Sequence, residues 1–212
     1  IGLRLPGSDS PVTFWDQIVT GRSGIVGVPE GRWDNPDFYY DPDPGKPDKT
    51  YSRIGGFVED IGFDPLKYRI PPAVASKMDR TQQLAITCVA NALEDAGLRP
   101  ADLKDQRVGI IIGNSMGGET TDRYAERVSL PRTLSCLDQA FQSANVAPET
   151  REAMIGEFET LFLAGLPDIT EDSLPGELAN VISGRVANVF NLVGPNFTVD
   201  AACASSMAAV TW

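Results

Sequence analysis

The chain has 212 residues, 42% of them hydrophobic, and is long enough to bury the core of one domain of ordinary size. Its formal net charge of −11 argues against nucleic acid or an anionic membrane as a partner of its surface. The sequence contains no apolar run long enough to span a bilayer and no signal-peptide pattern. We therefore expect a globular protein that works away from membranes and nucleic acids.

Cysteine and histidine usage narrows the chemistry further. The three cysteines, Cys88, Cys136 and Cys203, are odd in number and widely spaced, so neither a disulfide framework nor a zinc site is indicated. This usage predicts a reducing, cytoplasmic location. The chain has no histidine, does not begin with methionine, and stops at Trp212 inside an apparently helical segment. We therefore expect residues 1–212 to be a fragment that is truncated at both ends.

The first predicted element is an amphipathic helix. Ser10 is a good N-cap, Pro11 suits the first helical position, and Gly21 suits the C-terminal cap. The large apolar residues of this helix are expected to face the core: Phe14, Trp15, Ile18 and Val19.

A long loop is predicted over residues 28–49. This segment is dense in Pro, Asp, Gly and Tyr, a composition that makes both helix and strand unlikely. Asp41 and Asp43 could suggest a metal site or an acid–base pair, but a solvated turn is the better interpretation.

The remainder of the chain alternates predicted helices and strands. After Pro72, apolar residues at three- and four-residue spacing predict a long helix that ends at Gly97, with Cys88 as a structural residue on its apolar stripe. Residues 107–113 predict a buried strand of the parallel kind, and such an order of elements indicates α/β layers. Further helices are predicted at 119–164, with one apolar face, and at 175–189, followed by a strand at 196–199. The apolar face of the 119–164 region comprises Met154, Ile155, Phe158, Leu161 and Phe162.

One motif offers a serine as nucleophile. The run Gly113-Asn114-Ser115-Met116-Gly117 satisfies G-x-S-x-G directly after a predicted strand, which is the pattern of the nucleophile elbow in α/β-hydrolases. Ser115 would need a histidine later in the chain as its general base, and none occurs. A glycine-rich turn without chemistry explains the segment equally well, and it lacks the Lys-Ser/Thr pair of a phosphate loop.

The most informative segment surrounds Cys203. The predicted strand meets Asp200, and small residues then flank the cysteine in an Ala/Ser segment able to start a helix. A thiol at a helix N-terminus is favoured as the thiolate, which is the nucleophilic form. The small neighbours leave room for a substrate, and N–H groups of the turn could stabilise an oxyanion. The alternative is a buried structural cysteine in an Ala-rich helix.

Together these features resemble the β-ketoacyl synthase (ketosynthase) family of the thiolase superfamily, in the type I form of polyketide and polyunsaturated fatty acid synthases. The similarity extends along almost the whole chain, and its most specific motif is the one around Cys203, which is closer to the polyunsaturated fatty acid type. The motifs that support it are Leu5-Pro6-Gly7, Phe14-Trp15, Gly31-Arg32-Trp33, Tyr39-Tyr40-Asp41-Pro42, Met78-Asp79-Arg80-Thr81-Gln82-Gln83, Gly184-Arg185-Val186 and Val199-Asp200-Ala201-Ala202-Cys203-Ala204-Ser205-Ser206.

The resemblance implies a thiolase-like, layered αβαβα fold, of which residues 1–212 form the N-terminal portion. It implies that Cys203 accepts an acyl chain from acyl carrier protein and that decarboxylative condensation with a malonyl-type extender follows. The family's two catalytic histidines lie in its C-terminal half, so this fragment alone should not condense. The resemblance also implies a homodimer and no cofactor, with substrates held on the phosphopantetheine arm of the carrier.

Three hypotheses therefore stand side by side. The condensing enzyme needs a basic patch that binds an acidic carrier protein. This patch lies either on residues 1–212 or on the C-terminal half of the fold. The Ser115 hydrolase predicts a downstream Asp or Glu and a His. A non-catalytic scaffold, which would dimerise or limit chain length, predicts that Cys203→Ala leaves product formation intact. The candidates for the basic patch are Lys67, Arg69, Lys77 and Arg80.

Overall fold

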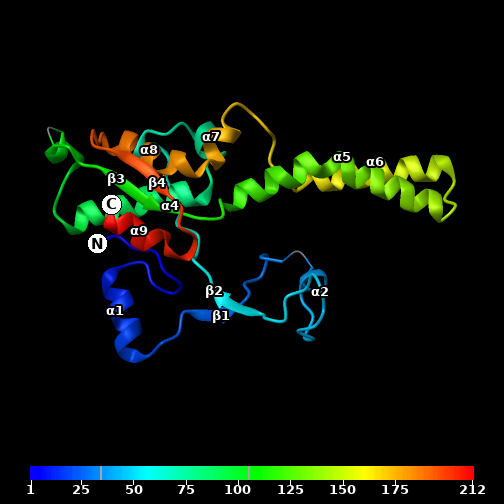
Figure 1. The fold of residues 1–212 in the computed structure, drawn as a ribbon, viewed down its shortest axis with the longest axis horizontal. Helices are drawn as coiled ribbons and strands as arrows, with labels where there is room; N and C mark the ends of the chain where they lie inside the picture. Colours follow the sequence, from blue (N-terminus) through cyan, green and yellow to red (C-terminus); the bar gives the residue numbers. More distant parts are fainter. Residues whose placement is uncertain (34, 105) are drawn as a thin grey trace. The chain divides into compact units, whose positions relative to one another are not determined.

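The computed structural model describes residues 1–33, 35–104 and 106–212. Its internal contacts divide the chain into two compact units, whose elements are drawn in Figure 1. The first unit comprises Ile1–Phe63 with Ile86–Asp102, and the second comprises Asp64–Ala85 with Leu103–Trp212. None of the helices in the described part of the chain combines the length and apolar character that a membrane span needs.

Short elements and long connections build the first unit. Strands β1 (Ile25–Gly27) and β2 (Ile54–Gly56) form an antiparallel pair. A two-stranded ribbon is marginally stable by itself, so side-chain packing around it matters. Trp33 stacks on Tyr39 with ring centroids 5.8 Å apart, and the Arg53 guanidinium lies 3.8 Å from the centre of the Tyr40 ring. The helical elements are α1 (Pro11–Thr20), α2 (Pro36–Tyr39), and α4 (Arg80–Asp95), which begins in the second unit.

Helix α1 begins after the Ser10 cap and ends at Gly21, as the sequence predicts. The predicted core position of its aromatic side chains is wrong, because Trp15 is 66% exposed. The inward position belongs instead to Gln17, whose amide donates to the Pro6 carbonyl at 3.1 Å. Because a buried amide must find hydrogen-bond partners, polar contacts rather than the apolar face set the rotation of α1.

The loop predicted over residues 28–49 contains one helical turn, α2, so the expectation of no helix there is wrong. Pro36 fits the first helical position, and the Asn35 side chain caps the turn by accepting a backbone N–H at 3.1 Å. Asp41 and Asp43 each accept a backbone N–H two residues ahead, at 3.0 Å and 2.9 Å. These are turn contacts, in agreement with the interpretation as a solvated turn.

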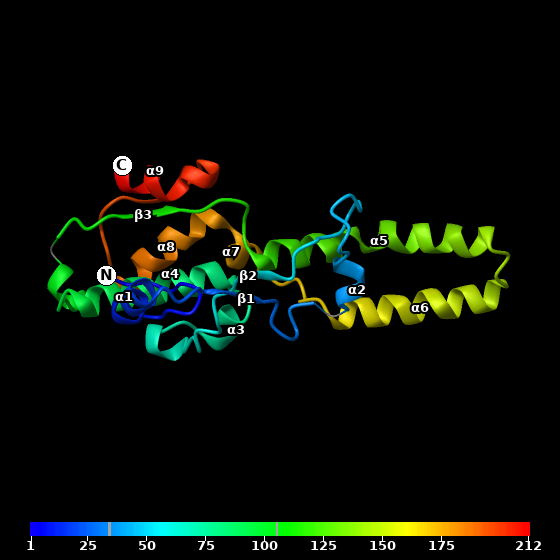
Figure 2. The same cartoon turned by 90° about the horizontal axis from the view of Figure 1, so that it is seen from below.

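The second unit is built around two parallel strands, β3 (Ile110–Gly113) and β4 (Asn196–Val199). Helices α8 and α9 both contact these strands, and Figure 2 shows them on opposite sides of β3, which gives the expected α/β layers. The elements around the strands are η1 (Leu66–Tyr68), α3 (Pro72–Ala75), η2 (Pro100–Leu103) at the boundary with the first unit, α5 (Glu119–Ser143), α6 (Pro148–Ala164), α7 (Ser173–Glu177), α8 (Ala179–Phe190), η3 (Ala202–Ala204) and α9 (Ser205–Thr211).

Three sequence predictions for this unit need correction. The helix expected from Pro72 to Gly97 is two helices, α3 and α4, separated by residues 76–79. The helix expected over 175–189 is likewise divided into α7 and α8 at Leu178, which is extended. Strand β3 is half-buried rather than buried, because in the described part of the chain only β4 pairs with it.

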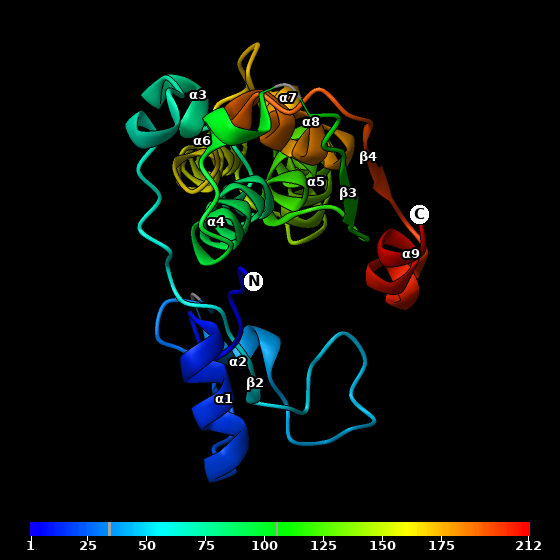
Figure 3. The same cartoon turned by 90° about the vertical axis from the view of Figure 1, so that its left-hand side faces the viewer.

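Helices α5 and α6 form a long antiparallel hairpin, which projects away from β3 and β4 in Figures 1 and 2 and is seen nearly end-on in Figure 3. Phe158 stacks on Phe162 at 5.5 Å between ring centroids, and Arg151 pairs with Asp138 of α5 at 2.7 Å. The apolar face predicted for α6 is only partly buried, since Leu161 is 65% exposed. A two-helix hairpin has no third element to cover that side.

Asp79, which is only 1% exposed, contacts α4 and α5 through its carboxylate and α7 through its backbone. It accepts the Thr81 N–H at 2.8 Å and the Thr81 hydroxyl at 2.6 Å at the start of α4, and the Thr120 N–H at 2.8 Å in the first turn of α5. The Asp79 N–H donates to the Gly176 carbonyl of α7 at 2.8 Å. Only glycine fits at position 118, because a Cβ there would collide with the Asp79 carboxylate.

Burial acts to raise the pKa of Asp79, but the hydrogen bonds from Thr81 and Thr120 outweigh burial and hold that pKa below its ordinary value. The folded pKa is therefore lower than the unfolded pKa. The charged carboxylate stabilises the fold above the unfolded pKa, and this contribution is lost as the pH falls through the folded pKa.

We expect Asp79→Asn to lower the free energy of unfolding by about 2 kcal/mol at neutral pH, because it weakens charge-assisted hydrogen bonds to buried donors. Denaturant titration measures the loss. The difference from the parent should shrink as the pH falls below about 4, the ordinary pKa of the unfolded carboxyl group, and disappear below the lower folded pKa. Asp43→Asn, in an exposed turn, is the matched control and should change stability little. If the difference in unfolding free energy between Asp79→Asn and the parent stayed constant down to acid pH, the electrostatic role of Asp79 would be contradicted.

Candidate functional site

Two loops leave the parallel strands at the same edge. Gly113 lies opposite Val199 in the register, so β3 and β4 end side by side. The Asn114 N–H donates to the Val199 carbonyl at 3.1 Å, which extends the pairing beyond the strands. The carboxyl ends of parallel strands are the usual place for sites in α/β proteins. The structure thus brings both sequence-predicted nucleophiles, Ser115 and Cys203, to the loops of one edge.

A tight turn presents Cys203 between β4 and α9. Ala202 has a φ of 50°, a left-handed conformation that residues with a Cβ rarely adopt. Asp200 supports this conformation, because its Oδ1 accepts the Ala202 N–H at 2.9 Å. The buried Ser205 hydroxyl accepts the Ala201 N–H at 3.0 Å and donates to the Ala202 carbonyl at 2.7 Å. The predicted strand-to-helix turn is confirmed, and two polar side chains hold it closed.

Helix α9 approaches the end of β3 very closely. A Cβ added at Gly113 would collide with the backbone of Ser205, so a larger residue would push α9 away. The turn that contains Cys203 is therefore fixed from two directions, by β4 before it and by β3 beneath α9. Backbone contacts of this kind tolerate little displacement because interiors are close-packed.

The three thiols lie in different surroundings. Cys203 and Cys136 are exposed, whereas Cys88 is half-buried in α4. Burial raises the pKa of Cys88, against a smaller, opposing effect of the Arg4 charge. Cys88 thus fits the structural role predicted for it. The exposure of Cys203 argues against its alternative interpretation as a buried core residue.

Ser115 does not lie on a nucleophile elbow. Strand β3 ends at Gly113 and α5 begins only at Glu119, so the serine is part of an extended loop rather than a sharp strand-to-helix turn. Met116 and Gly117 are both in the left-handed conformation, with φ of 65° and 68°, and the Met116 side chain is 98% exposed. In an elbow the serine itself occupies the strained turn. This geometry argues against the hydrolase hypothesis.

The four basic candidates for a carrier-binding patch differ in accessibility. Lys67 and Arg69 are exposed at the end of η1, whereas Lys77 and Arg80 are half-buried. The Lys77 ammonium group donates to the Asp168 carbonyl at 2.9 Å, which joins the segment between α3 and α4 to the segment between α6 and α7. Lys67 and Arg69 are therefore the most accessible of the four cations.

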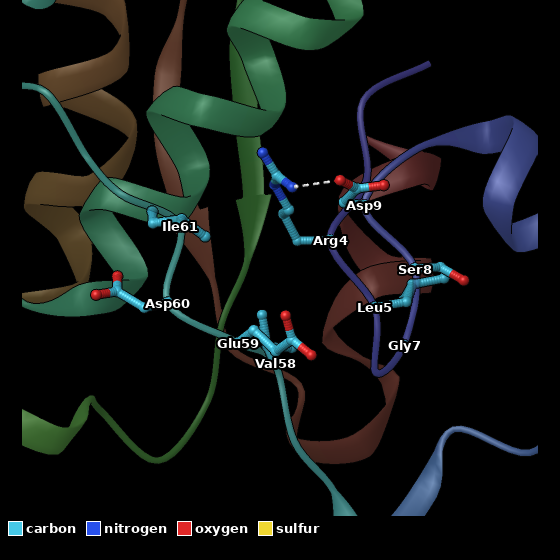
Figure 4. A pocket seen from close by; sticks show the side chains of 9 residues that line it. All are labelled: Arg4, Leu5, Gly7, Ser8, Asp9, Val58, Glu59, Asp60 and Ile61. Atoms are coloured by element: carbon cyan, nitrogen blue, oxygen red, sulfur yellow. Dashed lines mark ion pairs between the residues drawn. The ribbon is translucent and has the colours of Figure 1, made fainter.

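A hollow of about 230 Å³ lies in the first unit, lined by residues 4, 5, 7–9 and 58–61 (Figure 4). Arg4 reaches toward Asp9, with 3.6 Å between the nearest nitrogen and oxygen, while Asp60 points away from this pair. Glu59 adds a further acidic side chain, so the hollow mixes charges of both signs. In the residues that the structure describes, no group of Cys, Asp and Glu is arranged to hold a metal ion.

Sequence reasoning assigned no role to two residues that shape the edge of the strands. The sequence predictions treat Ser205 only as one of the small residues that flank Cys203. A serine at the start of a helix is nevertheless a signal for local hydrogen bonding to the preceding turn. Met116 gives no such signal, because glycine, asparagine and aspartate are the residues that indicate a left-handed position.

The fold and this edge define an α/β domain of the thiolase-like class. All of residues 1–212 match the model of the family described as "Beta-ketoacyl synthase, N-terminal domain". The chain therefore belongs to the β-ketoacyl synthase family and represents its N-terminal domain. The resemblance seen in the sequence is confirmed.

Curated relatives include synthases for polyketides and for polyunsaturated fatty acids. Polyketide synthase GfsB of Streptomyces halstedii is 35% identical over 209 residues, which are 98% of this chain and 3% of that protein. One chain of the polyunsaturated fatty acid synthase of a Thraustochytrium species is 30% identical over 196 residues, which are 92% of this chain and 7% of that protein. The chain thus spans only a small part of either relative.

Solved structures of ketosynthase domains show the same fold. The oxazolomycin ketosynthase domain OzmH KS7 of Streptomyces albus JA3453 aligns with a TM-score of 0.69 and 28% identity, covering 98% of this chain and 29% of that one. A ketosynthase from module 6 of the bacillaene synthase of Bacillus subtilis 168, solved as a point mutant, aligns with a TM-score of 0.65 and 25% identity, covering 98% of this chain and 27% of that one. The chain spans less than a third of each solved protein.

We expect Cys203 and Cys136 to react with iodoacetamide in the native protein at least about tenfold faster than Cys88. The exposed thiols are accessible, whereas Cys88 is half-buried and its pKa is raised by burial. A time course of alkylation, followed by peptide mass spectrometry, gives the three rates. Equal rates in the native protein would contradict the structural assignment of Cys88, and equal rates after denaturation serve as the control.

We expect Gly113→Ala to lower the melting temperature by several degrees, because the new Cβ would displace the Ser205 backbone. Gly156→Ala is the matched control. Gly156 lies inside α6 with open space where its Cβ would be, so alanine should leave stability unchanged or raise it by up to about 1 kcal/mol. Thermal unfolding compares the two variants, and equal behaviour would show that α9 does not depend on this close approach.

Proposed function

We propose that this chain supplies the acyl-accepting part of a decarboxylative condensing enzyme, with Cys203 as the nucleophile. The observation that supports it most directly is the exposed Cys203 on a left-handed turn at the carboxyl edge of β3 and β4, in a chain of the β-ketoacyl synthase family. The reaction belongs to fatty acid or polyketide biosynthesis, in keeping with the names of the relatives.

In the first step, the Cys203 thiolate attacks the carbonyl carbon of an acyl group that acyl carrier protein holds as a thioester. A new S–C bond forms, and the thiol of the carrier's phosphopantetheine arm leaves with a proton. Covalent capture divides a difficult C–C bond formation into two easier steps. Backbone N–H groups of the turn would stabilise the oxyanion that develops on the thioester carbonyl.

In the second step, a malonyl-type extender loses carbon dioxide, and the resulting enolate carbon attacks the acyl-Cys203 thioester. A C–C bond forms, the S–C bond breaks, and the cysteine thiolate is regenerated beside a β-ketoacyl thioester. The enolate needs hydrogen-bond donors, which the family supplies from two histidines. The sequence has no histidine, so we propose that residues 1–212 alone do not carry out this step.

The partner in this proposal is an acidic acyl carrier protein, and a homodimer is the proposed assembly. Lys67 and Arg69 are cations available to an acidic surface, although the chain as a whole carries −11. The proposed location is the cytoplasm, where Cys203 would remain a reduced thiol. No cofactor is proposed, since the carrier's arm holds the substrates.

Incubation of the full-length protein that contains residues 1–212 with an acyl-carrier thioester should place the acyl group on Cys203. Peptide mass spectrometry locates the adduct, which should disappear in Cys203→Ala and persist in Cys136→Ala, the control for an exposed cysteine elsewhere. Acylation of Ser115 would instead support a hydrolase. Product formation that survives Cys203→Ala would support a scaffold role for this domain.

A further inference from the structure

A hollow of about 690 Å³ lies in the second unit, and Cys203 is not among its lining residues. One wall is formed by residues 68–71 with the start of α3. The other wall is a face of α8, on which Val181, Arg185 and Asn188 follow one another at three- or four-residue spacing. The volume falls in the range of pockets for small organic ligands.

The charge of this hollow is opposite to that of the chain. Arg69 and Arg185 line it together with the side-chain amides of Asn188 and Asn191. Among the described residues of its lining none is acidic, although the chain carries a formal charge of −11. Guanidinium groups pair with carboxylate and phosphate oxygens in a two-pronged geometry, so the lining favours an anion.

Arg185 has hydrogen-bonding capacity that the fold does not use. Its Nε is buried and has no partner, and its Nη2 donates only a long bond, 3.5 Å, to the Pro175 carbonyl. Burial lowers the pKa of Arg185, against a smaller, opposing effect of the Asp172 charge. A half-buried guanidinium group that the fold pairs only weakly can gain free energy by pairing with an anion.

Arg69 stands in a conformation that glycine would adopt without cost. Its φ is 57°, at the residue that ends turn η1. The turn holds this conformation, because the Arg69 N–H donates to the Leu66 carbonyl at 3.1 Å. The side chain at this position adds a second guanidinium group to the hollow. Arg69 and Arg185 therefore place two guanidinium groups in the lining of one hollow.

The rest of the lining is apolar. Ile70, Val74, Val181 and Val189 line the hollow beside Tyr68. An apolar lining favours a ligand with an aliphatic part over a compact, strongly hydrated ion. The C-terminal end of α8, near Asn191, carries a partial negative charge, so the arginines must provide the attraction for an anion.

We propose that this hollow binds an amphipathic organic anion, a molecule with a carboxylate or phosphate head and an aliphatic body. The head accepts hydrogen bonds from Arg69 and Arg185, and the body lies against the valine and isoleucine side chains. This binding requires neither the Cys203 thiol nor a carrier protein. Arg69 is common to this hollow and to the basic patch proposed for the carrier.

The test is a calorimetric titration of the purified protein with octanoate and octyl phosphate, which share a body and differ in the head. Octanol and inorganic phosphate supply the body and the head alone. We expect saturable binding of one or both octyl anions, and binding of octanol and inorganic phosphate at least about tenfold weaker. Binding of octanol as tight as that of the anions, or of inorganic phosphate as tight, would overturn the proposal.

Three variants locate the site. Arg185→Gln and Arg69→Gly should each weaken binding of the octyl anions by about tenfold or more. Arg69→Gly also relieves the strained backbone, so its loss of binding cannot be attributed to unfolding. Arg132→Gln, an exposed arginine of α5, is the control of equal charge change and should bind as the parent does.

Hydrogen–deuterium exchange separates this site from the acyl-accepting edge. Whichever octyl anion binds in the titration should protect residues 68–74 and 181–191 in the parent and in Cys203→Ala alike. Protection confined to residues 114–118 and 200–206, or binding unchanged in both arginine variants, would overturn the proposal. An acidic carrier protein that binds through Arg69 and Arg185 while neither octyl anion binds would overturn it as well. All of these readouts are independent of acyl transfer.

Discussion

The hydrogen bonds of the Asp79 carboxylate are the interaction on which the second unit depends. They join the first turns of α4 and α5, and the Asp79 backbone reaches α7. Because α5 begins at this carboxylate, the loop between β3 and α5 has a fixed end at Gly118. Its other end is fixed at Gly113, where β3 meets the backbone of Ser205. A glycine at each end is a steric requirement of these two contacts.

The loop held between these two points shares the edge with the turn around Cys203. Its central residue, Met116, is left in a strained conformation with its side chain exposed. The turn is strained as well, at Ala202, and is closed by hydrogen bonds from Asp200 and Ser205. Strain at two adjacent loops is typical of functional sites, where the surrounding structure must over-determine the backbone. The helices and strands of this unit thus serve to hold a short, exposed segment in place.

The hollow beside α8 follows a different physical principle from the edge that contains Cys203. At the edge, small residues and backbone groups dominate. In the hollow, two long cationic side chains accompany an apolar lining. The same unit therefore contains an exposed thiol and a cationic, partly apolar hollow, which differ in chemistry.

Local sequence patterns were sufficient for the Cys203 turn, the caps of α1, the strand β4 and the family, because each depends on neighbouring residues or on a specific motif. Packing decided the rest. Trp15 is exposed because Gln17 takes the inward position, and the long helix before Gly97 is interrupted because Asp79 is buried between α4 and α5. The walls around Arg69 and Arg185 come from segments more than a hundred residues apart, which no local pattern connects. A sequence pattern records what each residue prefers, whereas tertiary contacts determine which preference prevails when two segments compete for the same space.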